Sequence, residues 1–133
     1  MEFVTLLDTN AYVALKKGHS VMVDRIRKSD RVIISVVVLG ELLFGFRHGS
    51  RYDKNVQELN QFLDHPMVTI KPVSEITADR FGRIACDLRR QGTPIPSNDI
   101  WIAAHAMETG AELLTLDGHF EKIPGLAVTW VQR

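Results

Sequence analysis

The stretch Phe3-Val-Thr-Leu-Leu-Asp8-Thr9-Asn10 has the pattern of a buried strand that ends on an acid. It begins with apolar and β-branched residues, and the sequence Ala-Tyr-Val-Ala-Leu that follows is typical of a helix start. A strand of this kind belongs in a parallel sheet, with Asp8 at its carboxyl end. Ligands of open α/β sheets bind just beyond the carboxyl ends of the strands. Asp8 is therefore a candidate site residue, although Asp8 or Asn10 could equally cap the next helix.

The size and composition of the chain indicate one ordinary globular domain, covering residues 1–133. Hydrophobic residues make up 45% and charged residues 24%, which is usual for such a domain. Lys plus Arg and Asp plus Glu number 16 each, so the net charge neither indicates nor excludes a nucleic-acid partner. We expect no membrane association, because the sequence shows no secretory signal and no apolar run long enough to span a bilayer.

The single cysteine, Cys86, cannot form an internal disulfide, which favours a reducing, cytoplasmic location. Cys86 falls in a helical pattern next to expected core positions. We therefore predict that it has a structural role and is not a nucleophile.

Strand-like and helix-like segments alternate along the chain. Short apolar runs predict strands at 4–7, 31–35, 67–70, 111–115 and 126–128. Helical patterns predict helices at 10–17, 21–28, 36–46, 51–64, 75–91 and 98–109. The expected capping residues are serines, at positions Ser20, Ser35, Ser74 and Ser97. This alternation predicts an α/β fold, a three-layer α/β/α sandwich with a mainly parallel central sheet.

The helix predicted at 36–46 carries a single charge, Glu41. The segment is apolar on almost all sides, so we expect it to be deeply buried. A lone buried carboxylate is costly unless a partner compensates its charge. The partner is either a bound cation or an arginine such as Arg47, unless Glu41 faces the surface.

Two further acids lie where a helix begins and where a strand ends. Asp99 falls in the first turn of a predicted helix, where the helix dipole stabilises a carboxylate and no other role is needed. Asp117 comes just after the predicted fourth strand, although Asp117-Gly118 could be a plain turn. If the sheet is parallel, Asp8 and Asp117 lie at the same edge of it.

We call these candidates the acidic quartet: Asp8, Glu41, Asp99 and Asp117. Carboxylates that are forced together repel one another, so a cluster of them requires a bound cation. We identify no histidine or cysteine ligand, and we interpret His105 as a packing or surface residue. Such a donor set suits a hard cation, Mg²⁺ or Mn²⁺, and ions of this kind assist the hydrolysis of phosphate esters.

Four segments of the chain resemble the motifs of PIN-domain ribonucleases. They are Leu-Leu-Asp8-Thr9-Asn10, Leu-Gly-Glu41-Leu-Leu-Phe-Gly, Ile95-Pro-Ser-Asn-Asp99-Ile-Trp-Ile-Ala-Ala-His-Ala and Leu-Leu-Thr115-Leu-Asp117-Gly-His-Phe. The resemblance covers the whole chain in order, and it is greatest to the VapC-type toxins of bacterial and archaeal toxin–antitoxin pairs. It implies a parallel sheet flanked by helices and a Mg²⁺- or Mn²⁺-dependent endoribonuclease with every acidic position filled.

The resemblance also implies roles for individual residues. Asp8 and Asp99 would be the principal metal ligands, and Glu41 and Asp117 would complete the pocket directly or through water. Thr9 and Thr115 would hydrogen-bond the carboxylates or the phosphate.

The resemblance further implies partners: an RNA substrate, a second copy in a homodimer, and an inhibitory antitoxin peptide lying over the pocket. The helices around 12–15 and 42–46 could supply the groove for that peptide, or they could be ordinary core.

Two other functions compete with this interpretation. One is a catalytically silent PIN-like module that binds RNA or a partner, which the filled quartet disfavours. The other is a phosphohydrolase with Asp8 as covalent nucleophile, a chemistry that usually needs a lysine near the phosphate. No lysine follows a strand in a suitable position. Weaker candidates for RNA-backbone contacts, on faces that could simply be solvated, are Arg51, Arg80 and Arg83.

Overall fold

A parallel sheet forms the centre of the computed structural model, which describes residues 2–133. The sheet has the order β3-β2-β1-β4-β5, and each neighbouring pair is parallel. Its strands are β1 (Val4–Leu7), β2 (Arg31–Ser35), β3 (Val68–Lys71), β4 (Glu112–Thr115) and β5 (Val128–Trp130). The predicted parallel sheet is confirmed, although β5 begins two residues later than expected.

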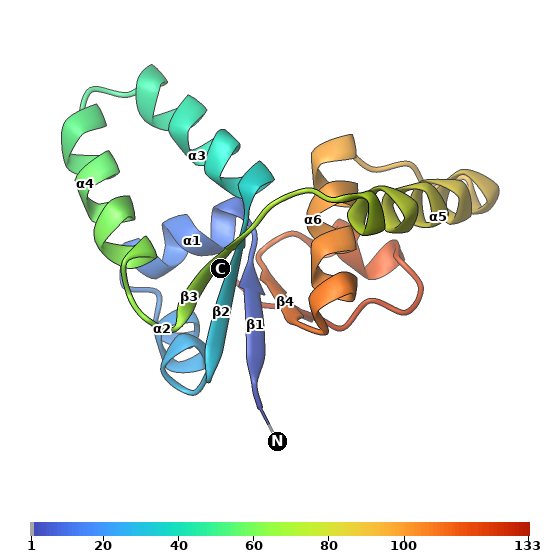
Figure 1. The fold of residues 1–133 in the computed structure, drawn as a ribbon, viewed down its shortest axis with the longest axis horizontal. Coiled ribbons are helices and arrows are strands. Elements are labelled where there is room, and N and C mark those ends of the chain that lie inside the picture. The colour runs from blue at the N-terminus through green and yellow to red at the C-terminus, as the bar shows by residue number, and fades with distance from the viewer. Residues whose placement is uncertain (1) are drawn as a thin grey trace.

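Six α-helices in residues 2–133 cover the two faces of this sheet. They are α1 (Thr9–Lys16), α2 (Ser20–Arg27), α3 (Val36–His48), α4 (Tyr52–Leu63), α5 (Glu75–Gln91) and α6 (Ser97–Thr109), with a short 3₁₀ helix η1 (Gly118–Lys122) before β5. Figure 1 shows α1 to α4 on one side of the sheet and α5 and α6 on the other. This arrangement confirms the three-layer α/β/α sandwich. None of these helices is long and apolar enough to cross a membrane.

The strand order creates a switch point at β1. The chain moves outward from β1 to β2 and β3, and then returns to add β4 on the other side of β1. Crevices form at the carboxyl ends of strands where the winding direction reverses in this way. Figure 1 shows that the carboxyl end of β1 and the first turn of α6 lie at the same end of the molecule.

The central strands are buried on both faces, because helices cover both. Leu6 and Leu7 of β1, like Leu113 and Leu114 of β4, have no exposed surface. A strand buried on both sides reads as a continuous apolar run without alternation, which is the pattern that the sequence shows.

Serine caps two of the four helices at which it was predicted. The Ser35 hydroxyl accepts from the amide of Val37 at the start of α3, and Ser74 caps α5 in a capping box with Thr77.

The cap predictions for the helices that start near residues 20 and 97 are wrong. The His19 side chain caps α2 by accepting from the amide of Met22. Pro96 precedes α6, and its carbonyl accepts from the amide of Asp99. Ser20 and Ser97 are instead the first helical residues.

Helix α3 is much less buried than its composition predicts. Val38 and Leu42 are buried, whereas Val36 is 41% and Phe44 is 64% exposed. Figure 1 shows the reason, because α3 extends away from the sheet and its second half lies beside α4. An apolar face of α3 therefore faces solvent. Cys86 is exposed on α5, so the expected structural role beside the core is wrong, whereas its lack of a nucleophilic role stays a prediction.

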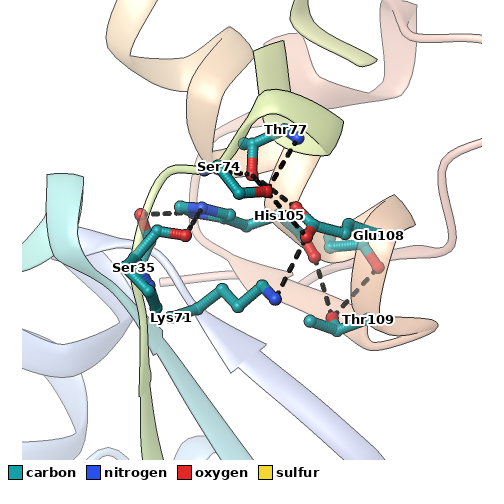
Figure 2. A network of polar contacts seen from close by, with 9 residues as sticks. Ser35, Lys71, Ser74, Thr77, His105, Glu108 and Thr109 are labelled. Carbon is teal, nitrogen blue, oxygen red and sulfur yellow. Dashed lines mark hydrogen bonds and ion pairs between the residues drawn. The ribbon is translucent and has the colours of Figure 1, made fainter. Parts of the chain in front are cut away.

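A buried histidine joins the sheet to the layer of α5 and α6, and Figure 2 shows its surroundings. His105 has no exposed surface, which confirms it as a packing residue. Its Nε2 lies 3.1 Å from the carbonyl oxygen of Pro72, and its Nδ1 lies 2.8 Å from Ser35 Oγ. A carbonyl only accepts, so Nε2 carries the proton and Nδ1 accepts from the Ser35 hydroxyl. Burial lowers the pKa of His105 and keeps this imidazole neutral.

Beside this histidine, Glu108 of α6 connects this helix to α5 and to the sheet (Figure 2). It pairs with Lys71 of β3 at 3.0 Å and accepts from Thr77 of α5 at 2.6 Å. Burial opposes ionisation of Glu108, but the contacts with Thr77 and Lys71 outweigh it and hold its pKa below the usual range. These contacts connect the start of α5 to the carboxyl-terminal end of α6, the helix that carries Asp99.

The neutral state of His105 predicts a loss of stability in acid. Its pKa is lower in the folded chain than in the unfolded chain, so the unfolded state binds more protons below about pH 6.5. The contribution of His105 to the free energy of unfolding should therefore be complete above that pH and fall as the pH drops. Urea unfolding at several pH values should give a flatter pH dependence for His105→Gln than for wild type. His48→Gln, on the exposed end of α3, should keep the wild-type dependence, and identical curves for all three proteins would contradict this role.

Candidate active site

The acidic quartet lines one hollow beyond the carboxyl end of β1, which we call the acidic hollow. Asp8 follows β1 and Asp117 follows β4, and these strands are paired with Leu7 opposite Leu114. The other two acids come from helices, Glu41 from α3 and Asp99 from the first turn of α6. The hollow has a volume of about 400 Å³, and it is also lined by Thr9, Asn10, Pro96, Ser97 and Asn98. The predicted gathering of the four carboxylates is confirmed.

Asp8 is buried at the bottom of the acidic hollow, only 4% exposed. Its Oδ1 accepts from the amide of Ala11 at 2.8 Å, and its Oδ2 accepts from Thr115 Oγ1 at 2.5 Å. Burial raises the pKa of Asp8 to about 6; the two hydrogen bonds oppose this rise, and the charges of Asp99 and Asp117 add to it. Asp8 therefore caps α1 and also lies in the hollow with the other acids. The sequence left a capping position and a site position open, and Asp8 occupies both.

Thr9 and Thr115 each donate a hydrogen bond to a carboxylate. A contact with the carboxylates or with the phosphate was expected of them. The Thr115 hydroxyl donates to Asp8 and accepts from the amide of Asp117 at 2.9 Å, so one buried side chain connects two acids. Thr9 Oγ1 donates to Glu41 Oε1 at 2.6 Å.

Glu41 is not paired with an arginine, which was one alternative. Its second oxygen, Oε2, lies 3.4 Å from the amide nitrogen of Asn98, a donor that the sequence did not single out. The Arg47 guanidinium instead donates to the hydroxyl of Tyr52 and lies over its ring. Glu41 thus has polar contacts but no cationic partner among residues 2–133.

His119 of η1 also contacts the quartet, and the sequence analysis missed it. Its Nε2 lies 2.7 Å from Asp99 Oδ2, and its Nδ1 lies 2.8 Å from Asp117 Oδ1. These three residues offer ligand atoms that all lie within 4.8 Å of one another. Burial raises the pKa of Asp99, and the contact with His119 opposes that rise. The expectation of a cluster without histidine is therefore wrong, although His119 stands only two residues after Asp117 in the fourth motif.

The segment that carries Asp117 and His119 is fixed by packing against Trp130. A Cβ atom at Gly118 would lie 2.8 Å from the indole ring, so only glycine allows this approach. The indole Nε1 donates to the carbonyl of Leu116 at 3.3 Å. The terminal strand β5 thereby holds the segment in position.

A second cavity, which we call the side groove, lies between α1, α3 and α4 and adjoins the acidic hollow through Thr9 and Glu41. Its volume is about 590 Å³. Its apolar lining comprises Tyr12, Val13, Leu42 and Phe46, and its basic lining comprises Lys16, Lys17, Arg51 and Lys54. The segments 12–15 and 42–46 thus contribute both to this groove and to the core.

The Tyr12 hydroxyl in the side groove is buried and has no hydrogen-bond partner within residues 2–133. Burial raises the pKa of Tyr12 to about 12, and the charge of Glu58 adds to this rise. A buried hydroxyl without a partner costs about 1–3 kcal/mol.

The arginines considered for RNA contacts lie in two different places. Arg51 lines the side groove, next to the acidic hollow. Arg80 and Arg83 line a separate cavity between α5, α6 and the Pro124–Gly125 turn, and no member of the quartet borders it. Of the three arginines, only Arg51 lines the same cavity as a member of the quartet, Glu41.

Comparisons with known proteins agree with this geometry. The family model described as the PIN domain matches residues 5–126. The chain belongs to the PIN-domain family. Ribonuclease VapC1 of Rickettsia felis is 33% identical to this PIN domain, over 95% of this chain and 95% of its own length. Ribonuclease VapC5 of Mycobacterium tuberculosis is 30% identical, over 92% and 89%.

Solved structures share the fold of this PIN domain. A chain in the VapBC2 structure from Rickettsia felis, bound to a DNA fragment from its promoter, has a TM-score of 0.85 at 28% identity, covering 96% of this chain and 98% of that one. A chain in the VapBC-1 structure from nontypeable Haemophilus influenzae has a TM-score of 0.84 at 27% identity, covering 96% and 97%. The resemblance to VapC-type PIN domains is thereby confirmed.

Proposed function

We propose that this PIN domain, residues 1–133, is a metal-dependent endoribonuclease and the toxin of a type II toxin–antitoxin system. The observation that carries the proposal is the gathering of the complete acidic quartet in one hollow at the switch point of the sheet. The names of the relatives, ribonuclease VapC, support the reaction and the substrate class. A catalytically silent module that only binds RNA or a partner is the alternative, and the full set of acids disfavours it.

The donor set of the acidic hollow fits a divalent cation. Its lining includes carboxylates from four separate segments of the chain and, among the described residues, no lysine or arginine. Mg²⁺ or Mn²⁺ would be held by Asp8 and Asp99, with Glu41 and Asp117 completing the site directly or through water. When bound, such an ion supplies Lewis-acid stabilisation of negative charge and lowers the pKa of water.

The residues of the chain itself position the reacting groups. Thr115 and the amide of Ala11 orient Asp8, and Thr9 with Asn98 orients Glu41. The amino-terminal end of α6 lines the hollow, and its dipole favours an anionic group such as an RNA phosphate. The missing lysine also disfavours a phosphohydrolase with Asp8 as covalent nucleophile.

The nuclease activity can be tested by replacing Asp8 and Asp99, the two principal metal ligands in this proposal, with asparagine. Asp8→Asn and Asp99→Asn remove a charge but keep the side-chain shape, and asparagine can still cap α1. We expect cleavage of total RNA with Mg²⁺ or Mn²⁺ to fall at least about 100-fold in each variant, with an unchanged circular dichroism spectrum. Asp79→Asn, on the exposed face of α5, should cleave like wild type, and chelator should stop all cleavage. Metal-dependent cleavage retained by both site variants would contradict the proposal.

We further infer that an antitoxin segment occupies the side groove and blocks the acidic hollow. The solved relatives are VapBC assemblies, and the apolar and basic lining of the groove offers contacts for a peptide. Because Thr9 and Glu41 border both cavities, a peptide in the groove would lie against the catalytic acids.

A charge placed in the groove should release the nuclease from this partner. We expect Phe46→Glu to lose co-purification with the product of the adjacent reading frame while RNA cleavage persists, because Phe46 lines the groove and not the hollow. Phe44→Glu is the matched control, since Phe44 lies on the same helix and is 64% exposed. Equal binding by Phe46→Glu and wild type would exclude the groove as the docking site.

We also propose a homodimer, for which an exposed apolar surface offers an interface. Ser35 and Lys71, the last residues of β2 and β3, lie opposite each other in the sheet. Val36, which follows β2, is therefore next to the connection from β3 to α5. The exposed apolar residues of this region are Val36, Ile70, Val73 and Ile76, between 41% and 59% exposed.

A charge on this surface should separate the two copies. We expect light scattering to give twice the chain mass of 15.0 kDa for wild type and 15.0 kDa for Ile76→Asp. Val21→Asp, at an exposed position of α2, should remain dimeric. A wild-type protein that is monomeric at every concentration would refute the dimer.

A further inference from the structure

The acidic hollow by itself is a poor binding site for an RNA strand. RNA carries a negative charge at each phosphate, and the hollow offers four carboxylates and, among the described residues, no lysine or arginine. A bound cation compensates the repulsion near itself, but the phosphates on either side of the scissile bond still face the acids. The affinity for a strand must therefore come from cationic groups beside the hollow.

The side groove supplies such groups, and it adjoins the hollow. Its four cations come from two helix ends: Lys16 and Lys17 from the end of α1, and Arg51 and Lys54 from the start of α4. Figure 1 shows both helices on the same side of the sheet. The groove is therefore basic on two of its walls.

Three of these four cations have no acidic partner within residues 2–133. Lys16, Lys17 and Arg51 form no ion pair in that part of the chain, and Lys54 lies 4.0 Å from Glu58. All four side chains are exposed. Their charge is thus available to a bound anion.

Helix stability explains only one of the two pairs. Lys16 and Lys17 complement the dipole at the carboxyl-terminal end of α1. Arg51 and Lys54 lie at the amino-terminal end of α4, where the dipole disfavours a cation, and Arg51 takes the N-cap position without a side-chain hydrogen bond to the helix. The charge at the start of α4 therefore fits a bound anion better than it fits the helix.

The cations are within reach of a strand that also occupies the hollow. Thr9, which borders both cavities, is the first residue of α1, and Lys16 is the last. The two residues lie about 10 Å apart along the helix axis. Protein sites for single strands cover about 4–16 nucleotides, so one strand spans this distance.

We propose that the side groove binds the RNA strand next to the scissile phosphate, and that its four cations contact the phosphates. This inference rests on the proposed nuclease. An antitoxin segment in the groove then inhibits by displacing RNA as well as by covering the acids. The cleavage that persists in Phe46→Glu should accordingly need a higher RNA concentration than cleavage by wild type.

Binding of a labelled oligouridylate of about 12 nucleotides to the wild-type chain in chelator tests the groove without cleavage. We expect a slope of about −2.8 for the logarithm of the binding constant against the logarithm of salt concentration, because each of four phosphate contacts contributes about −0.7. A wild-type slope shallower than about −1 would overturn the inference without any variant.

Two double variants each remove two charges from the groove: Lys16→Gln with Lys17→Gln, and Arg51→Gln with Lys54→Gln. We expect the Kd for the oligouridylate to rise about tenfold in each, and the slope to become shallower by about 1.4. Arg80→Gln with Arg83→Gln removes the same charge from the separate cavity beside α5 and should keep the wild-type values. An equal loss in all three would show a general effect of net charge and overturn the inference.

Cleavage kinetics with Mn²⁺ separate a role in binding from a role in chemistry. In both groove variants we expect KM to rise about tenfold and kcat to change less than about threefold, because the cations hold the strand while the acids act at the scissile bond. Unchanged Kd, slope and KM, in a chain that cleaves RNA, would overturn the inference and leave the nuclease. Salt-dependent binding that the groove variants weaken, in a wild-type chain that does not cleave RNA, would support the groove and overturn the nuclease.

Discussion

Electrostatic repulsion among the carboxylates at the carboxyl end of β1 is the constraint on which the rest of the site depends. The parallel pairing of β1 with β4 brings Asp8 and Asp117 to one edge, and α3 and α6 add Glu41 and Asp99. Burial raises the pKa of Asp8 to about 6, so its charged state has a cost in the folded chain. Donors such as Thr115 reduce this cost, and a bound cation would remove most of the remainder.

The residues that hold the fold together at this edge also build the site. Asp8 caps α1. Thr115 is the last residue of β4, and its hydroxyl connects Asp8 to the amide of Asp117. On the neighbouring strand, Ser35 caps α3 and donates to His105 of α6. Since α3 and α6 each carry one of the acids, the capping contacts that stabilise the helices also set the separation of the carboxylates.

The proposed control by an antitoxin depends on the exposed apolar surface of α3. Its apolar residues are only partly covered by the sheet and by α4, so they border the side groove on one side and face solvent at Val36 and Phe44. Thr9 and Glu41 lie at the boundary between this groove and the acidic hollow. A partner in the groove would therefore reach the acids without any change in the sheet.

The sequence alone determined the alternation of strands and helices, the parallel sheet and the four acids, because these depend on local patterns of apolar residues and on acids at strand ends or helix starts. It could not determine contacts between distant segments. His119 stands two residues after Asp117 in the sequence, but only the fold brings its ring to Asp99, which lies 20 residues away on α6. Asn98 near Glu41, the exposure of Cys86 and the solvent-facing side of α3 were missed for the same reason. Which side of a helix is covered depends on its neighbours in space, and only the tertiary structure decided that.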